Sequence, residues 1–142
     1  MTLAPAALGR LIRQLRVDEG VEKKPYKDAV GKVTIGIGRN LDDRGLSDDE
    51  IEYLCANDIR IVEVELDRHA PWWKSAPEGV QIGLANMCFN LGWPRLSGFK
   101  KMLGCLERGE HAAAAEHALD SKWAEQVGER AERIADLFRG KI

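Results

Sequence analysis

The chain opens with a stretch in which apolar side chains recur every three or four residues. Within residues 5–18 these side chains are Leu8, Leu11, Ile12 and Leu15. Positions at that spacing share one face of a helix, so the pattern predicts an amphipathic helix over about residues 5–18. We expect its apolar face to dock on a core and its carboxyl end to present Glu19.

A different pattern follows, with turn residues and then a two-residue alternation of side chains. The alternating run is Val33-Thr34-Ile35-Gly36-Ile37-Gly38, which is typical of β-strands rather than of a helix. Asp28 to Gly31 reads as the turn between two strands. Gly20, directly after Glu19, is expected to end the first helix in a left-handed conformation. Together these signals predict a short β-hairpin.

The remaining pattern is helical. Ser47 to Glu50 forms a capping box that starts a helix over about residues 48–69, after a polar turn at residues 40–45. Its apolar side is predicted to hold Ile51, Leu54, Cys55, Ile59, Val62 and Leu66. Pro71 breaks that helix, and residues 77–92 predict an apolar helix buried on most sides and ending at Gly92. Shorter helices are expected over residues 97–107, 109–119, 121–126 and 129–138. The predicted class is therefore α+β and mainly helical.

Composition narrows the choice of function. Cys55, Cys88 and Cys105 are widely spaced within apolar helical patterns, so we expect buried free thiols rather than disulfides. The three histidines have no metal-ligand spacing with them, and we expect no metal and no other cofactor. The N-terminal residues hold no long apolar run, so neither a signal peptide nor a membrane anchor is expected.

The net charge of −2 hides a segregation along the chain. Residues 1–41 carry a net charge of +4, residues 42–70 of −7 and residues 71–142 of +1. A nucleic-acid-binding protein usually has a coherent basic surface, so the charge pattern gives little reason to expect a nucleic-acid partner. The chain is expected not to insert into a membrane, and to be a monomer.

Candidate chemistry gathers around the first helix end and the hairpin. Glu19 faces the negative end of the helix dipole, which disfavours its ionised form. A protonated Glu beside an ionised Asp28 is what glycoside hydrolysis needs, with Thr34 in place to hold a water molecule. On spacing alone, however, a Glu and an Asp nine residues apart are a solvated pair in most proteins.

A resemblance strengthens the catalytic interpretation. The ordered set that carries it is Arg16, Asp18-Glu19-Gly20, Tyr26-Lys27-Asp28, Gly31 and Thr34-Ile35-Gly36-Ile37-Gly38. It resembles the catalytic signature of phage-type lysozymes, glycoside hydrolase family 24, which the T-even phage lysozyme typifies. The resemblance implies one lysozyme-like domain over residues 1–142. In it, a small hairpin lobe of about residues 14–47 is joined by a helix of about residues 48–70 to a helical lobe of about residues 71–142, which also takes in the N-terminal helix.

The same resemblance implies roles for individual residues. It makes Glu19, Asp28 and Thr34 the catalytic triad. Substrate contacts are implied for Asn40, Phe89, Asn90, Met102 and His117, and supporting roles for Tyr26, Arg39 and Arg130. Arg39 stands where the family has a histidine with an ionic role. Arg130 matches an arginine that lies beside the catalytic Glu in the family, although an exposed surface position is an equal alternative.

The implied activity is hydrolysis of the β-1,4 bond between N-acetylmuramic acid and N-acetylglucosamine in bacterial peptidoglycan, with inversion. The implied setting is phage lysis of a host, in which the enzyme waits in the host cytoplasm until a holin opens the way to the wall. A lytic transglycosylase and a non-catalytic wall-binding protein are the alternatives. The pairing of Asp28 with Thr34 argues against the first, and the intact triad against the second.

Overall fold

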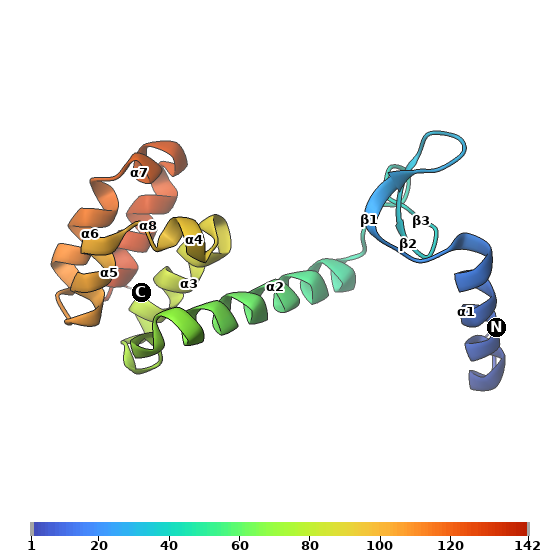
Figure 1. The fold of residues 1–142 in the computed structure, drawn as a ribbon, viewed down its shortest axis with the longest axis horizontal. Helices are drawn as coiled ribbons and strands as arrows, with labels where there is room; N and C mark the ends of the chain where they lie inside the picture. The colour runs from blue at the N-terminus through green and yellow to red at the C-terminus, as the bar shows by residue number, and fades with distance from the viewer. Residues whose placement is uncertain (1, 142) are drawn as a thin grey trace. The chain divides into compact units, whose positions relative to one another are not determined.

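The computed structural model describes residues 2–141, which divide into two compact units between residues 52 and 53. Figure 1 labels the helices and strands of both units. The α+β, mainly helical class predicted from the sequence is confirmed, with one small antiparallel sheet in the first unit and a helical second unit. No helix within residues 2–141 is both long and apolar enough to span a bilayer.

Helix α1, Pro5–Glu19, opens the first unit with a proline in its first turn, where the missing N–H costs no hydrogen bond. Glu19 is its last residue, as predicted. Gly20 has a φ of 76°, but its ψ of 177° leads into an extended path rather than the left-handed helical cap expected from sequence. No residue of α1 is buried, so the predicted docking of its apolar face is not made within this unit.

A three-stranded antiparallel sheet follows, in the order β1-β2-β3. Strand β1, Glu22–Lys27, and strand β2, Val33–Gly36, form the predicted hairpin, in which Tyr26 lies opposite Thr34. Strand β3, Arg39–Asn40, is an addition, because its two polar residues carry no alternation that would predict a strand. Gly36, the last residue of β2, and residues 37–38 form the turn from β2 to β3 (Figure 1).

The predicted capping box starts helix α2, Asp48–His69. The Ser47 N–H donates to Glu50 at 2.8 Å, and the Glu50 N–H donates to the Ser47 hydroxyl at 3.3 Å. Arg39 binds the same Glu50 carboxylate from β3, with both terminal guanidinium nitrogens 2.6 Å from carboxylate oxygens. The start of α2 is therefore tied to the sheet within the first unit.

The second unit is built on a helical core. Its elements are α2 from residue 53 on, the 3-10 helix η1 (Pro71–Ser75), α3 (Glu78–Leu91), α4 (Trp93–Leu96), α5 (Lys100–Glu107), α6 (His111–Leu119), α7 (Lys122–Val127) and α8 (Glu129–Phe138). As predicted, α3 is the apolar helix and ends at Gly92. It packs against α8, and α6 packs against both α5 and α8. The largest fully buried side chains include Leu66, Leu84, Met87, Leu96, Met102, Ile134 and Phe138.

Three predictions about this unit were wrong in part. The helix expected over residues 97–107 begins only at Lys100, and the separate α4 precedes it, because Pro94 is tolerated in the first turn of a helix. The apolar side predicted for α2 buries only Val62 and Leu66. Cys88 and Cys105 are buried free thiols as expected, whereas Cys55 is exposed, because the α2 residues that enter the core are Val62 and Leu66.

The contact between α3 and α8 gives the first prediction. A Cβ atom on Gly79 would lie 2.2 Å from the backbone oxygen of Leu137, which cannot move without shifting α8. We expect Gly79→Ala to lower the free energy of unfolding by about 1–3 kcal/mol, measured by chemical denaturation. The control is Gly9→Ala in α1, where the added Cβ meets a side chain at an ordinary 3.6 Å. That change should leave stability unchanged or raise it by up to about 1 kcal/mol. Equal effects of the two changes would contradict the proposed close packing.

The pair of Arg39 and Glu50 gives a second prediction. Hydrogen bonds from Arg39, and then from Ser47, lower the pKa of Glu50 from 4.5 to about 2. A carboxylate whose pKa is depressed on folding stabilises the folded state above its unfolded pKa and loses that contribution as the pH falls. The stability gap between the wild type and Glu50→Gln should therefore be full above pH 4.5 and shrink as the pH falls to about 2. Thermal unfolding across that range measures it, and a gap that does not change with pH would refute the interpretation.

Candidate active site

Glu19 lies at the carboxyl end of α1, and its side chain meets the turn between β2 and β3. A Cβ built on Gly38 would lie 2.7 Å from Oε2 of Glu19 and 3.0 Å from its carboxyl carbon. The carboxyl group therefore rests against bare glycine backbone. Glu19 is otherwise exposed, and none of the side-chain hydrogen bonds found within residues 2–141 ends on its carboxylate. An exposed carboxyl group at this place is accessible to an incoming ligand.

Asp28 begins the turn that connects β1 to β2, and its side chain organises that turn. Its Oδ1 accepts hydrogen bonds from the N–H groups of Val30 at 3.0 Å and Lys32 at 2.8 Å, a geometry that aspartate favours in turns. The Gly31 N–H donates to the Asp28 carbonyl at 3.0 Å, which confirms the predicted turn. Because both N–H groups use Oδ1, Oδ2 is left for another donor.

Thr34 is the buried polar member of the set, with only 4% of its surface exposed. Its hydroxyl donates to the carbonyl of Lys32 at 3.0 Å. Lys32 also donates its N–H to Asp28, and its carbonyl accepts the Asp28 N–H at 2.9 Å. One residue, Lys32, thus fixes both Asp28 and Thr34. Since the Thr34 proton is used on a carbonyl, its hydroxyl oxygen can only accept from a further group.

The supporting and rim residues of this unit have clear contacts. Tyr26 is half-buried opposite Thr34 in the β1–β2 pair. The Asn40 amide donates to Asp43 at 3.0 Å and accepts the Asp43 N–H at 2.9 Å, so both ends of the side chain are occupied within the loop. Arg39 forms an ion pair with Glu50, with a guanidinium nitrogen 2.6 Å from a carboxylate oxygen, and its supporting role at the site stays a prediction. These residues hold the loop around the catalytic candidates.

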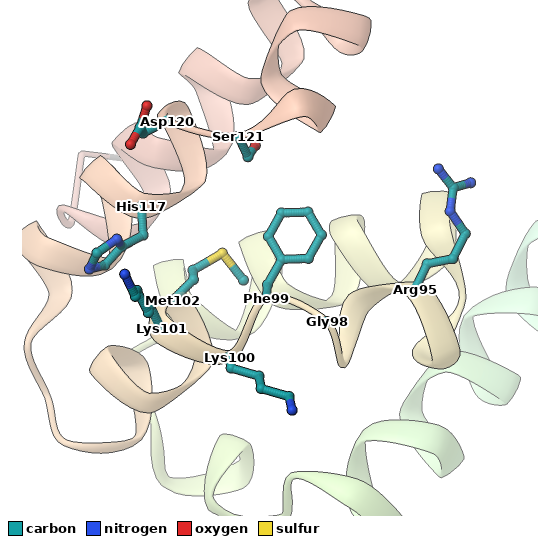
Figure 2. A pocket seen from close by; sticks show the side chains of 9 residues that line it. All are labelled: Arg95, Gly98, Phe99, Lys100, Lys101, Met102, His117, Asp120 and Ser121. Carbon is teal, nitrogen blue, oxygen red and sulfur yellow. The ribbon is translucent and has the colours of Figure 1, made fainter.

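The second unit contains a pocket of about 630 Å³ between α5 and α6, shown in Figure 2. Two residues predicted to bind substrate, Met102 and His117, line it. Met102 is 1% exposed, so it is mainly a core residue, whereas His117 is half-buried. Lys101 and His117 lie at one end of the pocket and Arg95 at the other, with Phe99 between them. The pocket thus combines an aromatic wall with cationic side chains.

The other predicted contacts of this unit lie elsewhere. Phe89 is 45% exposed and lines an apolar groove of about 380 Å³, together with Arg130. The side-chain oxygen Oδ1 of Asn90 accepts the indole N–H of Trp123 at 2.9 Å, and this hydrogen bond links α7 to α3. Arg130 binds the side-chain oxygen of Asn86 through two nitrogens, at 3.0 and 2.8 Å. Its predicted place beside Glu19 stays a prediction.

Sequence reasoning missed several lining residues of the α5–α6 pocket, namely Arg95, Gly98, Phe99, Lys100, Lys101, Asp120 and Ser121. The only local signal was the spacing of His117 and Asp120, which puts them on neighbouring turns of one helix end. The others come from three different places: Arg95 from α4, residues 98–101 from the approach and first turn of α5, and Ser121 from the N-cap of α7. No group of three or more His, Cys, Asp or Glu side chains within residues 2–141 is arranged to hold a metal ion.

The chain is similar in sequence to several known proteins. The chain is 27% identical to "Probable T4-type lysozyme 2" of Dictyostelium discoideum, over 87% of the chain and 90% of that protein. It is 25% identical to "Probable T4-type lysozyme 1" of the same organism, with the same coverage. It is also 26% identical to "Pre-baseplate central spike protein Gp5" of Enterobacteria phage T4. That match covers 90% of the chain, but the chain spans only 27% of the length of Gp5.

The sequence model of one family, described as phage lysozyme, matches residues 16–139. This range contains Glu19, Asp28 and Thr34 as well as the pocket residues of the second unit, and it covers most of the chain. The chain therefore belongs to the phage lysozyme family, and by that membership it is a lysozyme-type glycosidase.

Proposed function

We propose that this chain hydrolyses the β-1,4 bond between N-acetylmuramic acid and N-acetylglucosamine in the glycan strands of bacterial peptidoglycan. The observation that carries the proposal is the arrangement of Asp28 and Thr34 around Lys32, which leaves one carboxylate oxygen and one hydroxyl oxygen for a water molecule. An accessible Glu19 belongs to the same unit. Family membership supplies the reaction class, and these side chains supply its chemistry.

In the proposed reaction, Glu19 is the general acid. Its proton passes to the glycosidic oxygen as the bond from that oxygen to the anomeric carbon breaks. The departing sugar leaves with a free hydroxyl group, and positive charge develops on the ring that stays. Glu19 suits this task because its carboxyl group is exposed and its position is limited by the Gly38 backbone.

Asp28 and Thr34 act on the water. Oδ2 of Asp28 and the Thr34 hydroxyl oxygen both accept hydrogen bonds, so a water that donates to both presents its lone pair to the anomeric carbon. The water oxygen bonds to that carbon, and its proton passes to Asp28. Attack by water on the face opposite the leaving group inverts the anomeric configuration.

The α5–α6 pocket is proposed to bind part of the substrate, with Met102 and His117 among its contacts. Lys100, Lys101 and Arg95 take part in none of the ion pairs found within residues 2–141, so their charges remain for a ligand. Peptidoglycan carries carboxylates on its peptide stems, and cations at a pocket rim attract them. Asn40, Phe89 and Asn90 are proposed as further contacts, with Tyr26 and Arg130 in support.

The proposed setting is lysis of a bacterial host by a phage or prophage, with the enzyme held in the host cytoplasm until a holin gives access to the wall. The chain is proposed to act as a monomer and without a cofactor. A lytic transglycosylase needs an acid but no held water, so the paired acceptors of Asp28 and Thr34 favour hydrolysis. A wall-binding protein without activity has no need of either.

The general acid is tested with Glu19→Gln. Because the amide cannot donate a proton as an acid does, kcat on purified peptidoglycan should fall by about 10²–10⁴-fold while the fold is kept. Mass spectrometry of the products should show reducing-end muramic acid from the wild type. Glu22→Gln in β1 is the control and should retain wild-type kcat.

The outcomes separate the alternatives. Anhydro-muramic products from the wild type would identify a lytic transglycosylase. Wall binding with no products from the wild type would identify a binding protein, and full activity of Glu19→Gln would remove Glu19 from the mechanism.

The water-holding pair is tested with Asp28→Asn and Thr34→Val. In Asp28→Asn the side-chain amide oxygen can still accept both N–H groups of the turn, so the loss of charge should lower kcat without unfolding the hairpin. Asp42→Asn is the matched control, since Asp42 also accepts a backbone N–H, from Val33 at 2.8 Å. Thr34→Val removes one hydrogen bond and should lower kcat about tenfold.

Proton NMR of fresh product should show the α anomer first if water attacks directly. The β anomer first would indicate retention and give Asp28 a different role. Equal activity of Asp28→Asn and Asp42→Asn would remove Asp28 from the mechanism.

A further inference from the structure

The turn that meets Glu19 is flexible by composition. Residues 36–38 contain two glycines, Gly36 with a φ of 67° and Gly38 with a φ of 68°. Glycine restricts the backbone least, so such a turn needs outside contacts to hold one conformation. The contact matters because the Glu19 carboxyl group rests against Gly38 and accepts no side-chain hydrogen bond found within residues 2–141. A shift of Gly38 would therefore change the position that the Glu19 carboxyl group can occupy.

Arg39 supplies the outside contact. Its backbone pairs with Ile35 across the turn, which closes residues 36–38 from both sides. Its guanidinium binds both oxygens of Glu50, each at 2.6 Å, and also donates to the Gly45 carbonyl at 3.2 Å. A planar guanidinium that binds both oxygens of a carboxylate has little rotational freedom. The Arg39 side chain is 24% exposed, so solvent weakens this pair less than a typical surface pair.

Glu50 is itself fixed, because it accepts the Ser47 N–H in the capping box of α2. A continuous set of contacts thus leads from the start of α2 through Glu50 and Arg39 to Gly38, and from Gly38 to the Glu19 carboxyl group. The turn and the ion pair also line one hollow of about 410 Å³, with Ile37, Gly38, Arg39 and Glu50 in its walls. Every member of this set belongs to the first unit.

We propose that Arg39 is a positioning residue for the general acid. Its ion pair with Glu50 holds Gly38 in place, and Gly38 sets the position of the Glu19 carboxyl group. This inference rests on the proposed function for its effect on catalysis, but the positioning itself is a property of the free protein. Arg39 touches no reacting atom in this account and acts only through the turn.

The test is Arg39→Gln, assayed well below its melting temperature. We expect kcat to fall about tenfold or more while KM changes by less than about twofold. A displaced acid stabilises the transition state less well but leaves the contacts that bind the substrate unchanged. Arg39→Lys, which keeps one charged contact with Glu50, should recover part of the loss. The control is Arg108→Gln in the second unit, which removes a similar two-point pair with Glu110, at 3.1 Å for each contact. It should keep wild-type kcat.

A double-mutant cycle shows whether the effect passes through Gly38. Gly38→Ala forces the Glu19 carboxyl group away by itself, so Arg39→Gln should lower kcat much less in that background than in the wild type. Multiplicative effects of the two changes, or an Arg39→Gln variant that melts earlier but keeps full kcat, would overturn the proposal. If Arg39→Gln does not fold, Glu50→Gln breaks the same pair and takes its place.

A readout without turnover separates this proposal from the proposed function. NMR at constant pH should show the Gly38 amide and the Glu19 carboxyl carbon shifting in Arg39→Gln and not in Arg108→Gln. If the wild type cleaves no peptidoglycan but these shifts occur, the proposed function fails and the positioning stands. If neither resonance moves, the positioning is refuted whatever the activity.

Discussion

The structure of the first unit depends on the contact between the Glu19 carboxyl group and the backbone of Gly38. The Glu19 carboxyl carbon occupies space that a Cβ on Gly38 would need, so the turn between β2 and β3 has to carry glycine there. The positive φ of Gly38 adds a second reason for the same residue. The cost is a turn with little stiffness of its own. The unit makes up for that with the strand pairing of Ile35 and Arg39 and with the ion pair to Glu50, both of which lie directly beside the turn.

The second unit uses glycine for a different purpose. Gly79 brings α3 close to the last turn of α8, and Gly83 leaves room for the ring of Phe138, which would lie 2.7 Å from an added Cβ. These contacts let the apolar helix α3 approach α8 closely and bury Val80, Leu84 and Met87 in the core. The same two helices, α3 and α8, are also joined by a polar contact, in which Arg130 of α8 donates to the side chain of Asn86 of α3. The packing thus places polar groups at the edge of a core that glycine has made compact.

The sequence predicts most of what depends on near neighbours. The turn at Asp28, the capping box at Ser47 and the end of α3 at Gly92 follow from residues within a few positions of one another. Helix α4 was missed because a proline two residues after Gly92 is typical both of a helix stop and of a new first turn. The partner of Arg39 was not predicted, since it depends on how residues 41–47 fold. The bonds of Asn90 with Trp123 and of Arg130 with Asn86 join residues 33 and 44 positions apart, and no local pattern reports such distances.

The separation of basic and acidic segments along the chain is explained in part by ion pairs and hydrogen bonds within the first unit. The acidic segment 42–70 follows a basic segment, and its first carboxylates bind the sheet rather than only facing solvent. Asp43 pairs with Lys32 at 3.1 Å, Asp42 accepts the Val33 N–H, and Glu50 binds Arg39. Each of these bonds lies close to a residue of the proposed reaction: Lys32 holds Asp28, Val33 precedes Thr34, and Arg39 follows Gly38, which the Glu19 carboxyl group contacts. The acidic residues Asp42, Asp43 and Glu50 therefore act as acceptors that fix the hairpin and the turn after it, next to the side chains proposed for catalysis.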